Sequence, residues 1–242
     1  MLCLLLGAAV SLPAGVPKPV KLERKVYAMG TEYVIDLYGT NVARMEGAAE
    51  QASEEAKRLD QMLSNYLPDS EMSAVNRAAA DHPVAVSNEL FNLLSTCFRY
   101  SRESEGSFDI TVGPLMKIWG FYKGSGHLPH RAEVREALEH IGYQNVVLDS
   151  ARHTVSFRKQ GMTLDPGGVG KGYAVDRMVA ILRANGMTSA LVSGGGSSIY
   201  GIGTPPNEPR GWYVRIRDPK TEEKTAAEVY LKDNSVSTSG NY

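Results

Sequence analysis

The stretch Thr163-Leu164-Asp165-Pro166-Gly167-Gly168-Val169-Gly170-Lys171-Gly172-Tyr173-Ala174-Val175-Asp176 joins an apolar segment to an amphipathic one through a glycine-rich turn. Residues 155–157 and 162–164 have the composition of strands, and apolar residues recur at helical spacing from Gly170 until Asn185-Gly186. The turn is therefore predicted to join a strand to a helix. The first N–H groups of a helix lack partners and favour an anion, and Lys171 adds a positive charge. An ordinary turn, with Lys171 in solvent and Asp165 as a cap, fits these residues equally well.

Two common nucleotide-binding motifs do not fit this turn. A P-loop has a glycine five residues before its Gly-Lys pair and a Ser or Thr after the lysine. The chain has Asp165 and Gly172 at those positions. The glycines also lack the G-x-G-x-x-G spacing of a dinucleotide-binding turn. If the turn binds a phosphate, it does so in another way.

The composition limits the class of protein. With 242 residues, 43% of them hydrophobic, the chain is long enough for one large domain or two small ones with a real core. A formal net charge of −1 gives no basic excess for binding nucleic acid. No run of 18 apolar residues is present, so a membrane-spanning helix is not expected.

The first residues of the chain resemble an export signal. Residues 1–12 are almost wholly apolar, prolines follow, and Ala14-Gly15 is a possible cleavage region, although the usual basic start is missing. We therefore predict an export segment over residues 1–20 and one domain over 21–242. With that segment removed, Cys97 is the remaining cysteine and is expected in the core.

The rest of the pattern predicts an α+β protein. Helices are expected at 42–63, 87–102, 114–119 and 131–140, and from Gly170 to the Asn185-Gly186 stop, with a polar turn segment at 64–76 and an extended piece at 108–113. Strands are expected at 21–27, 32–38, 145–148, 154–157, 162–164, 189–192, 198–201, 211–217, 227–231 and 235–238. Because the chain stops directly after a strand-like segment, we expect it to be C-terminally incomplete.

Six segments together resemble the ApbE family of FAD:protein FMN transferases, in the family's order over roughly residues 25–242. They are Ala28-Met29-Gly30-Thr31; Ser64-Asn65-Tyr66 with Asp69-Ser70-Glu71 and Asn76; Phe108 to Leu115 with Trp119-Gly120-Phe121; Leu164-Asp165 with residues 171–176; Ser193-Gly194-Gly195; and Thr238-Ser239-Gly240. Each segment is weak alone, and their order makes the resemblance specific. It implies a single globular α+β unit with mixed or antiparallel sheets and FAD in a cleft.

The resemblance also implies a reaction. It is magnesium-dependent transfer of FMN from FAD to a threonine hydroxyl of an acceptor protein, with release of AMP. The implied acceptor is a flavoprotein subunit of a membrane redox complex. The implied location is the periplasm or the outer face of the cytoplasmic membrane.

Three alternatives stay open: an FAD pyrophosphatase that yields FMN and AMP, a non-catalytic FAD-binding protein, and a structural domain without flavin. The family's C-terminal His-Ile-Ile-Asp-Pro-like and Asp-Ala-x-Ser-Thr-like segments are missing here, and the second supplies magnesium ligands. Their absence favours the binding protein and predicts that the chain as written is inactive or nearly so.

The resemblance assigns site residues by position. The expected FAD contacts are Met29, Tyr66, Ser107, Phe108, Asp109, Asp165 and Lys171. Met29 would touch the flavin, Tyr66 would stack on it, and Lys171 would offset the charge of the pyrophosphate. Gly168 could bind magnesium only through its backbone carbonyl, and no catalytic residue is assigned. From the residues alone, a core position at a turn is the favoured interpretation of Met29. Asp176 is expected to be structural, paired with a nearby basic residue.

Overall fold

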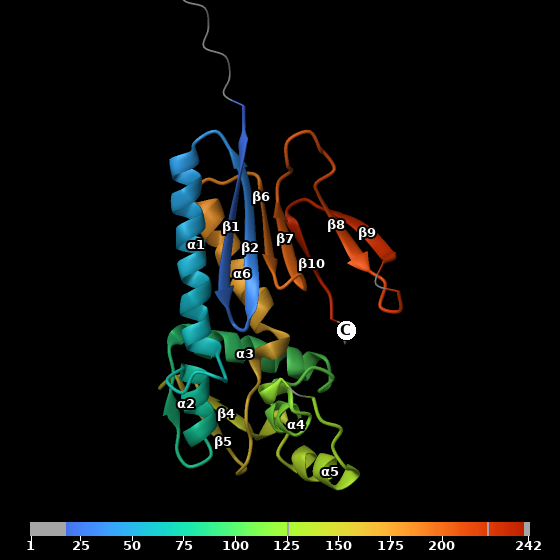
Figure 1. The fold of residues 1–242 in the computed structure, drawn as a ribbon. Helices are drawn as coiled ribbons and strands as arrows, with labels where there is room; N and C mark the ends of the chain where they lie inside the picture. Colours follow the sequence, from blue (N-terminus) through green and yellow to red (C-terminus); the bar gives the residue numbers. More distant parts are fainter. Residues whose placement is uncertain (1–17, 125, 222, 240–242) are drawn as a thin grey trace, which may run out of the picture.

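A five-stranded antiparallel sheet forms the upper half of the molecule (Figure 1). The computed structural model describes residues 18–124, 126–221 and 223–239. The strands are ordered β1-β2-β6-β7-β10 across the sheet, so the long N-terminal hairpin lies beside strands from the end of the chain. Their bounds are β1 (Val20–Ala28), β2 (Thr31–Gly39), β6 (Ala190–Gly194), β7 (Ser198–Ile202) and β10 (Asn234–Ser237).

Two helices, α1 (Val42–Leu63) and α6 (Gly170–Ala184), cover one face of this sheet (Figure 1). Alanine recurs along α1 at helical spacing, and its small side chains let α6 and the sheet approach closely. Asn41 caps the start of α1 by accepting a hydrogen bond from the backbone N–H of Arg44, at 3.0 Å. The buried stripe of α1 is Met45, Ala48, Ala49, Ala52, Ser53, Ala56, Leu59, Met62 and Leu63.

The middle of the chain forms the lower half, which is mainly helical (Figure 1). Its elements are α2 (Glu71–Ala78), β3 (Val84–Ala85), α3 (Asn88–Glu103), α4 (Gly113–Ile118), the 3-10 turn η1 (Phe121–Lys123), α5 (Arg131–Glu139), the 3-10 turn η2 (Tyr143–Asn145), β4 (Val146–Asp149) and β5 (Thr154–Phe157). A small antiparallel sheet pairs its strands in the order β3-β5-β4. A separate hairpin, β8 (Trp212–Arg217) and β9 (Thr225–Leu231), lies beside the large sheet, and the 3-10 turn η3 (Pro166–Gly168) precedes α6.

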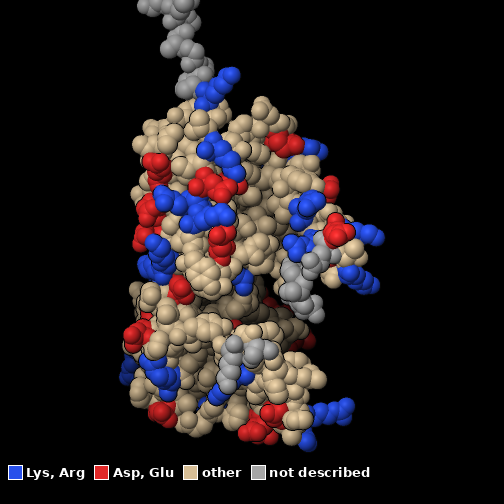
Figure 2. Space-filling model, viewed as in Figure 1, with Lys and Arg blue, Asp and Glu red and all other residues tan. Residues whose placement is uncertain are grey.

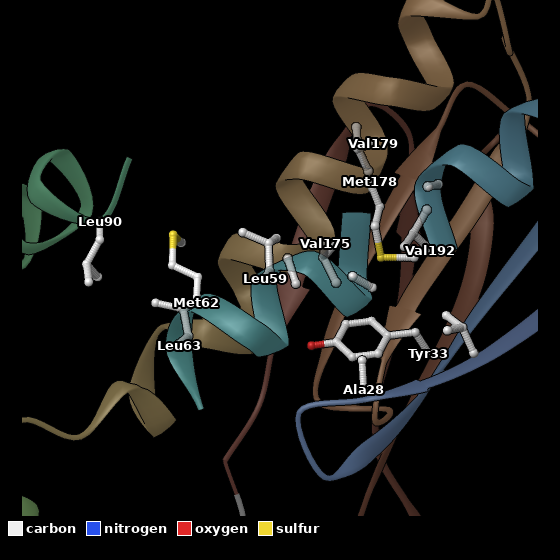
Figure 3. Packing of buried hydrophobic residues seen from close by; sticks show 14 of the residues in the cluster. Ala28, Tyr33, Leu59, Met62, Leu63, Leu90, Val175, Met178, Val179 and Val192 are labelled. Carbon is white, nitrogen blue, oxygen red and sulfur yellow. The ribbon is translucent and has the colours of Figure 1, made fainter. Parts of the chain in front are cut away.

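The core lies where the large sheet meets α1 and α6, and it continues toward α3 (Figure 3). Tyr33, Leu59, Val175 and Met178 come together there from strand β2 and both helices. Tyr33, Leu59 and Met178 are 0% exposed, and truncating such a side chain to alanine costs about 2 to 5 kcal/mol of stability. This packing sets the position of the first turn of α6 relative to the sheet.

Most predictions of local structure are confirmed. The fold class is α+β, as predicted, with helices at 42–63, 88–103, 113–118, 131–139 and 170–184. Cys97 is buried, at 2% exposed. No helix in the described part of the chain is long and apolar enough to cross a membrane. The predicted export segment lies mostly outside the described residues.

Three predictions are wrong. Residues 162–164 form no strand; the backbone N–H and carbonyl of Leu164 bond to the Asn76 side chain rather than to a neighbouring strand. The polar segment 64–76 is not all turn, because Ser70 caps a helix, α2, by accepting from the N–H of Ser73 at 2.9 Å. Asp176 has no ion-pair partner among the described residues; its neighbour Arg177 makes the ion pair instead, with Glu55 at 3.0 Å.

Candidate functional site

A cavity of about 250 Å³ lies between the two halves of the molecule. Four chain segments meet there: the β1–β2 turn, the end of α1 with the residues that follow it, the η1 region, and the turn before α6. Figure 2 shows the surface hollowed between the upper and lower halves. The lining residues are Met29, Asp60, Leu63, Ser64, Asn65, Tyr66, Met116, Phe121, Tyr122, Asp165, Pro166, Gly167, Gly170 and Lys171.

The β1–β2 turn brings Met29 to the cavity in an unusual backbone conformation. Met29 has φ of 52° and Gly30 has φ of 71°, the left-handed pair of a two-residue type I′ hairpin. Side chains other than Asn or Gly take this conformation at a cost of about 1 to 2 kcal/mol. The Tyr33 hydroxyl donates to the Met29 sulfur at 3.2 Å. A methionine held at this cost, at the wall of a cavity, is typical of a functional position.

Gly170 makes the close approach of α6 to this turn possible. A Cβ atom added to Gly170 would lie 3.2 Å from the terminal methyl of Met29. Helix α6 can therefore begin directly against Met29, and both residues line the cavity. The glycine is explained by close packing here, because its φ is not positive.

Asp165 lines the cavity with both carboxylate oxygens already in hydrogen bonds. One oxygen accepts from the backbone N–H of Gly167 at 2.7 Å, which holds the turn before α6. The other accepts from the Tyr122 hydroxyl at 2.7 Å and from the Asn65 side-chain amide at 3.4 Å. The residue is 8% exposed, so its orientation is determined by the protein rather than by solvent.

Two asparagines tie this carboxylate to the end of α1 and to α2. The Asn76 amide group donates to the Asn65 side-chain oxygen and to the Leu164 carbonyl, both at 3.0 Å. The Asn76 oxygen in turn accepts from the Leu164 N–H at 2.7 Å. These bonds satisfy both backbone groups of Leu164 in place of a strand partner, and they hold the residue directly before Asp165.

Tyr66 and Tyr122 form an edge-to-face pair at the rim of the cavity. Their ring centroids are 5.8 Å apart and their planes are 89° to one another, a favourable aromatic geometry. Tyr66 is 65% exposed, so its ring is accessible to a ligand. Burial, followed by the hydrogen bond to Asp165, raises the pKa of Tyr122, so its hydroxyl keeps its proton and acts as a donor to that carboxylate.

Lys171 and the start of α6 form the open side of the cavity. Val169 provides no side-chain cap to the helix, so the first N–H groups of α6 keep their capacity to bind an anion. Lys171 is half-buried and, among the residues that the structure describes, has no ion-pair partner. The helix start and the ammonium group together favour a phosphate in this part of the cavity.

The structure does not bring the segment Ser107-Phe108-Asp109 to the cavity wall. One Asp109 oxygen accepts from the backbone N–H and the hydroxyl of Thr111, and the other from the N–H of Tyr143 at 2.9 Å. Asp109 therefore holds together two loops of the lower half. Phe108 packs against the core near Gly168, and Ser107 is exposed. FAD contacts from these three residues stay predictions.

The described residues do not by themselves make a magnesium site. No group of three His, Cys, Asp or Glu side chains gathers anywhere in the described part of the chain. Asp60 and Asp165 line the cavity, but both oxygens of Asp165 are already bonded within the protein. Gly168 is exposed and does not line the cavity. Magnesium prefers carboxylate oxygens together with substrate phosphates, so the Gly168 role stays a prediction.

From the sequence, no role was predicted for three side chains of this site. Asn65 and Asn76 belong to the resembling segments, but no role was assigned to them. Tyr122 was not named at all. The only signal was that an aromatic residue follows Trp119-Gly120-Phe121, and its partner Asp165 is 43 residues away.

Comparison with known proteins gives one consistent family. A family model described as the ApbE family matches residues 29–242. An FAD:protein FMN transferase of Treponema pallidum (strain Nichols) is 30% identical over 100% of this chain and 70% of its own length. Proteins of the same name from Klebsiella pneumoniae (strain 342) and Escherichia coli (strain K12) are 30% and 28% identical over 88% of this chain. The chain spans 64% and 62% of the lengths of these two.

Solved structures agree with the fold. The apbe protein of Thermotoga maritima has a TM-score of 0.80 at 29% identity, over 89% of this chain and 69% of that chain. The flavin transferase ApbE from Vibrio cholerae has a TM-score of 0.80 at 23% identity, over 92% and 72%. At that lower identity the likeness concerns the fold alone.

Proposed function

This chain belongs to the ApbE family, and from that premise we propose that it transfers FMN from FAD to a threonine hydroxyl of an acceptor protein, releasing AMP. One observation carries the proposal: a single cavity is lined by an accessible aromatic ring, a methionine sulfur, and a lysine at an uncapped helix start. FAD offers the complementary groups, a flat ring system and a pyrophosphate. The relatives named FAD:protein FMN transferase support this choice of ligand.

The flavin is proposed to lie between Met29 and Tyr66. A tyrosine ring is flat and rigid, and a thioether is polarisable, so both suit a broad aromatic ligand. The cavity volume of about 250 Å³ lies below the roughly 300 to 1,000 Å³ of sites that enclose a whole ligand. The described residues therefore suit one part of FAD rather than the complete dinucleotide.

The pyrophosphate is proposed to lie at Lys171 and the start of α6. The threonine oxygen would form a bond to the FMN-side phosphorus as the bond from that phosphorus to the AMP phosphate breaks. AMP would leave with the bridging oxygen and the bonding electrons, and the hydroxyl proton would pass to solvent. Phosphoryl-type transfer needs positioning and stabilisation of charge. Lys171 and the helix N–H groups would stabilise the negative charge on the transferring and leaving phosphates.

Magnesium dependence is part of the proposal, although the described residues do not make a metal site. When bound to the phosphates, the ion would neutralise part of their charge. The arrangement described above assigns no step to it. Comparison of transfer in magnesium with transfer in excess EDTA tests the dependence, and equal rates in both would contradict it.

The experiment that tests the function supplies FAD, magnesium and an acceptor domain with a reactive threonine. The expected product is acceptor protein with covalently attached FMN, detected by in-gel flavin fluorescence and intact mass, together with AMP. The same acceptor with its threonine changed to alanine is the control. Absence of covalent flavin with every acceptor tried, despite bound FAD, would contradict the transferase proposal.

The same assay separates the alternatives. AMP released at an equal rate without any acceptor would favour an FAD pyrophosphatase. Intact FAD recovered from the protein, with no AMP under any condition, would favour a binding protein. No bound FAD at all would contradict each of these functions.

The acceptor and its location are also proposals. We propose that the acceptor is a flavoprotein subunit of a membrane redox complex, and that the protein acts in the periplasm or on the outer face of the cytoplasmic membrane. The apolar residues 1–12 support export. Fusion of residues 1–20 to a reporter that is active only outside the cytoplasm tests this. Absence of reporter activity, although the fusion protein is present in the cells, would contradict export.

A further inference from the structure

Tyr122 contacts two side chains that line the cavity, Asp165 and Tyr66. Its hydroxyl donates to Asp165 at 2.7 Å, and its ring edge meets the ring of Tyr66 with centroids 5.8 Å apart. The Asn65 amide lies 3.4 Å from the same hydroxyl. One side chain therefore joins the carboxylate of the turn before α6 to the exposed ring at the cavity rim.

Tyr122 also separates two hollows. Besides the cavity of about 250 Å³, a second hollow of about 340 Å³ opens on the other side, where Arg77 and Lys117 lie. Asn65, Tyr66 and Tyr122 line both hollows. The Tyr122 ring is half-buried between them, so it belongs to the partition that limits the size of the first cavity.

The backbone around Tyr122 explains how it reaches this position. Gly120 has φ of 74°, and this left-handed residue turns the chain sharply after α4. The His127 N–H then donates to the Trp119 carbonyl at 2.9 Å and closes the loop that carries η1. A Cβ at Gly120 would lie 3.2 Å from backbone atoms of Gly126 and His127. The chain therefore passes close to itself at Gly120, two residues before Tyr122.

From this arrangement we propose that Tyr122 is a positioning residue for the proposed flavin transfer. Its hydroxyl holds the Asp165 carboxylate in one orientation. Its ring fixes the orientation of the Tyr66 ring through the edge-to-face contact, and it forms part of the wall between the cavity and the second hollow. The inference rests on the proposed function, because the ligand in question is FAD. The hydroxyl and the ring have separate tasks, and two substitutions separate them.

Tyr122→Phe removes the hydroxyl and keeps the ring. The hydrogen bond to a charged partner is lost, so we expect FAD to bind roughly 5- to 20-fold more weakly, with the quenching of bound flavin fluorescence unchanged. Tyr122→Leu removes the ring as well. We expect it to reduce that quenching, because Tyr66 loses its edge contact, and to let the protein accept bulkier flavin analogues. Tyr100→Phe, at a tyrosine that is 52% exposed and lines no hollow described here, is the matched control and should behave like the unchanged protein.

A double-mutant cycle tests the hydrogen bond without any ligand. Urea unfolding is measured for the unchanged protein, Tyr122→Phe, Asp165→Ala and the combination. If the two groups act as a pair, Tyr122→Phe lowers the unfolding midpoint in the unchanged background and does not lower it further beside Asp165→Ala. Additive effects would contradict the pairing.

The outcomes distinguish the two proposals. No FAD binding by the unchanged protein would contradict the proposed function, while the unfolding cycle would still decide the Tyr122–Asp165 pair. FAD binding with unchanged affinity and unchanged quenching in both Tyr122 variants would overturn the positioning role. If both variants lose affinity equally and their bound flavin spectra are identical, the proposal that the hydroxyl and the ring have separate tasks is contradicted.

Discussion

Asp165 and Lys171 stand six residues apart on the same turn and line the same cavity, yet the protein holds them in opposite ways. Both oxygens of Asp165 accept hydrogen bonds, at 2.7 Å from the Gly167 N–H and 2.7 Å from the Tyr122 hydroxyl. Lys171 has no ion-pair partner among the described residues. The carboxylate is part of the framework, and the ammonium group is left for a ligand. Substitution of two charged residues in one motif can therefore affect different properties: the stability of the fold for one and the binding of a ligand for the other.

The largest expected effect is on stability at Asp165. Asp165→Ala leaves the Tyr122 hydroxyl and the Gly167 N–H without their partner, so we expect the free energy of unfolding to fall by about 2 to 4 kcal/mol. Lys171→Ala should change it by less than about 0.5 kcal/mol, because no ion pair among the described residues is lost. Urea unfolding of both variants measures the difference, and equal losses would break the comparison.

Neighbouring glycines give a second, smaller contrast. A Cβ on Gly167 would lie 2.7 Å from an Asp165 oxygen, whereas one on Gly168 would lie 3.7 Å from the Phe108 ring. We expect Gly167→Ala to lower the free energy of unfolding by about 1 to 2 kcal/mol, because the carboxylate must move. Gly168→Ala should stay within about 0.5 kcal/mol. Thermal unfolding compares the two, and a larger loss for Gly168→Ala would show that Asp165 is not the rigid partner.

For FAD affinity, unlike stability, we expect the substitution at Lys171 to have the direct effect on the ligand. Lys171→Gln removes the unpaired positive charge, and we expect FAD to bind about 10-fold more weakly in low salt. The difference from the unchanged protein should shrink as ionic strength rises, because salt screens the lost attraction. Titration of flavin fluorescence at two salt concentrations measures this. An unchanged affinity at low salt would place the anion elsewhere.

The smallest effect concerns the ion pairs that hold α6, the helix that carries Lys171. Glu55 on α1 lies 3.0 Å from Arg177 on α6 and 2.8 Å from Arg58. The Arg58 hydrogen bond, with help from Arg177, lowers the pKa of Glu55 from 4.5 to about 2. Because the folded pKa is the lower one, the stability that this carboxylate contributes is present above about pH 4.5 and is lost as pH falls toward about 2.

We expect this contribution to be no more than about 1 kcal/mol, since the arginines are largely exposed. Unfolding of the unchanged protein and of Glu55→Gln, measured from pH 6 to pH 3, tests it. The two stability curves should converge as the pH falls. Curves that stay parallel would show that Glu55 does not support α6 through its charge.

Local sequence patterns predicted those helices in which apolar residues recur at helical spacing along the whole element. Helix 42–63 has the predicted bounds, because Ala and Leu recur along it at helical spacing and Asn41 caps its start. Residues 162–164 were predicted wrongly as a strand, because an apolar triplet has the same appearance when side chains such as Asn76 satisfy its backbone. Nothing local distinguishes a neighbouring strand from an asparagine 88 residues away.

The candidate site shows the same division. Met29, Tyr66, Asp165 and Lys171 were expected from resembling segments, and the structure brings them to one cavity. Ser107, Phe108 and Asp109 were also expected as FAD contacts, which stays a prediction; they do not line this cavity, and Asp109 bonds to Thr111 and Tyr143. Tyr122 was missed, because its contacts are with residues far away in the sequence: Asp165, 43 residues later, and Asn65, 57 residues earlier.

By itself, the sequence determined the α+β class, the helix that follows the glycine turn, and the family to which the chain belongs. These depend on periodicity, capping and short ordered motifs, which are local properties of the chain. Only the tertiary structure decided which charge of the turn is bonded within the protein and which is open. That difference depends on whether another segment places a hydrogen-bonding partner within about 3 Å, and folding alone brings the Tyr122 hydroxyl to 2.7 Å from Asp165.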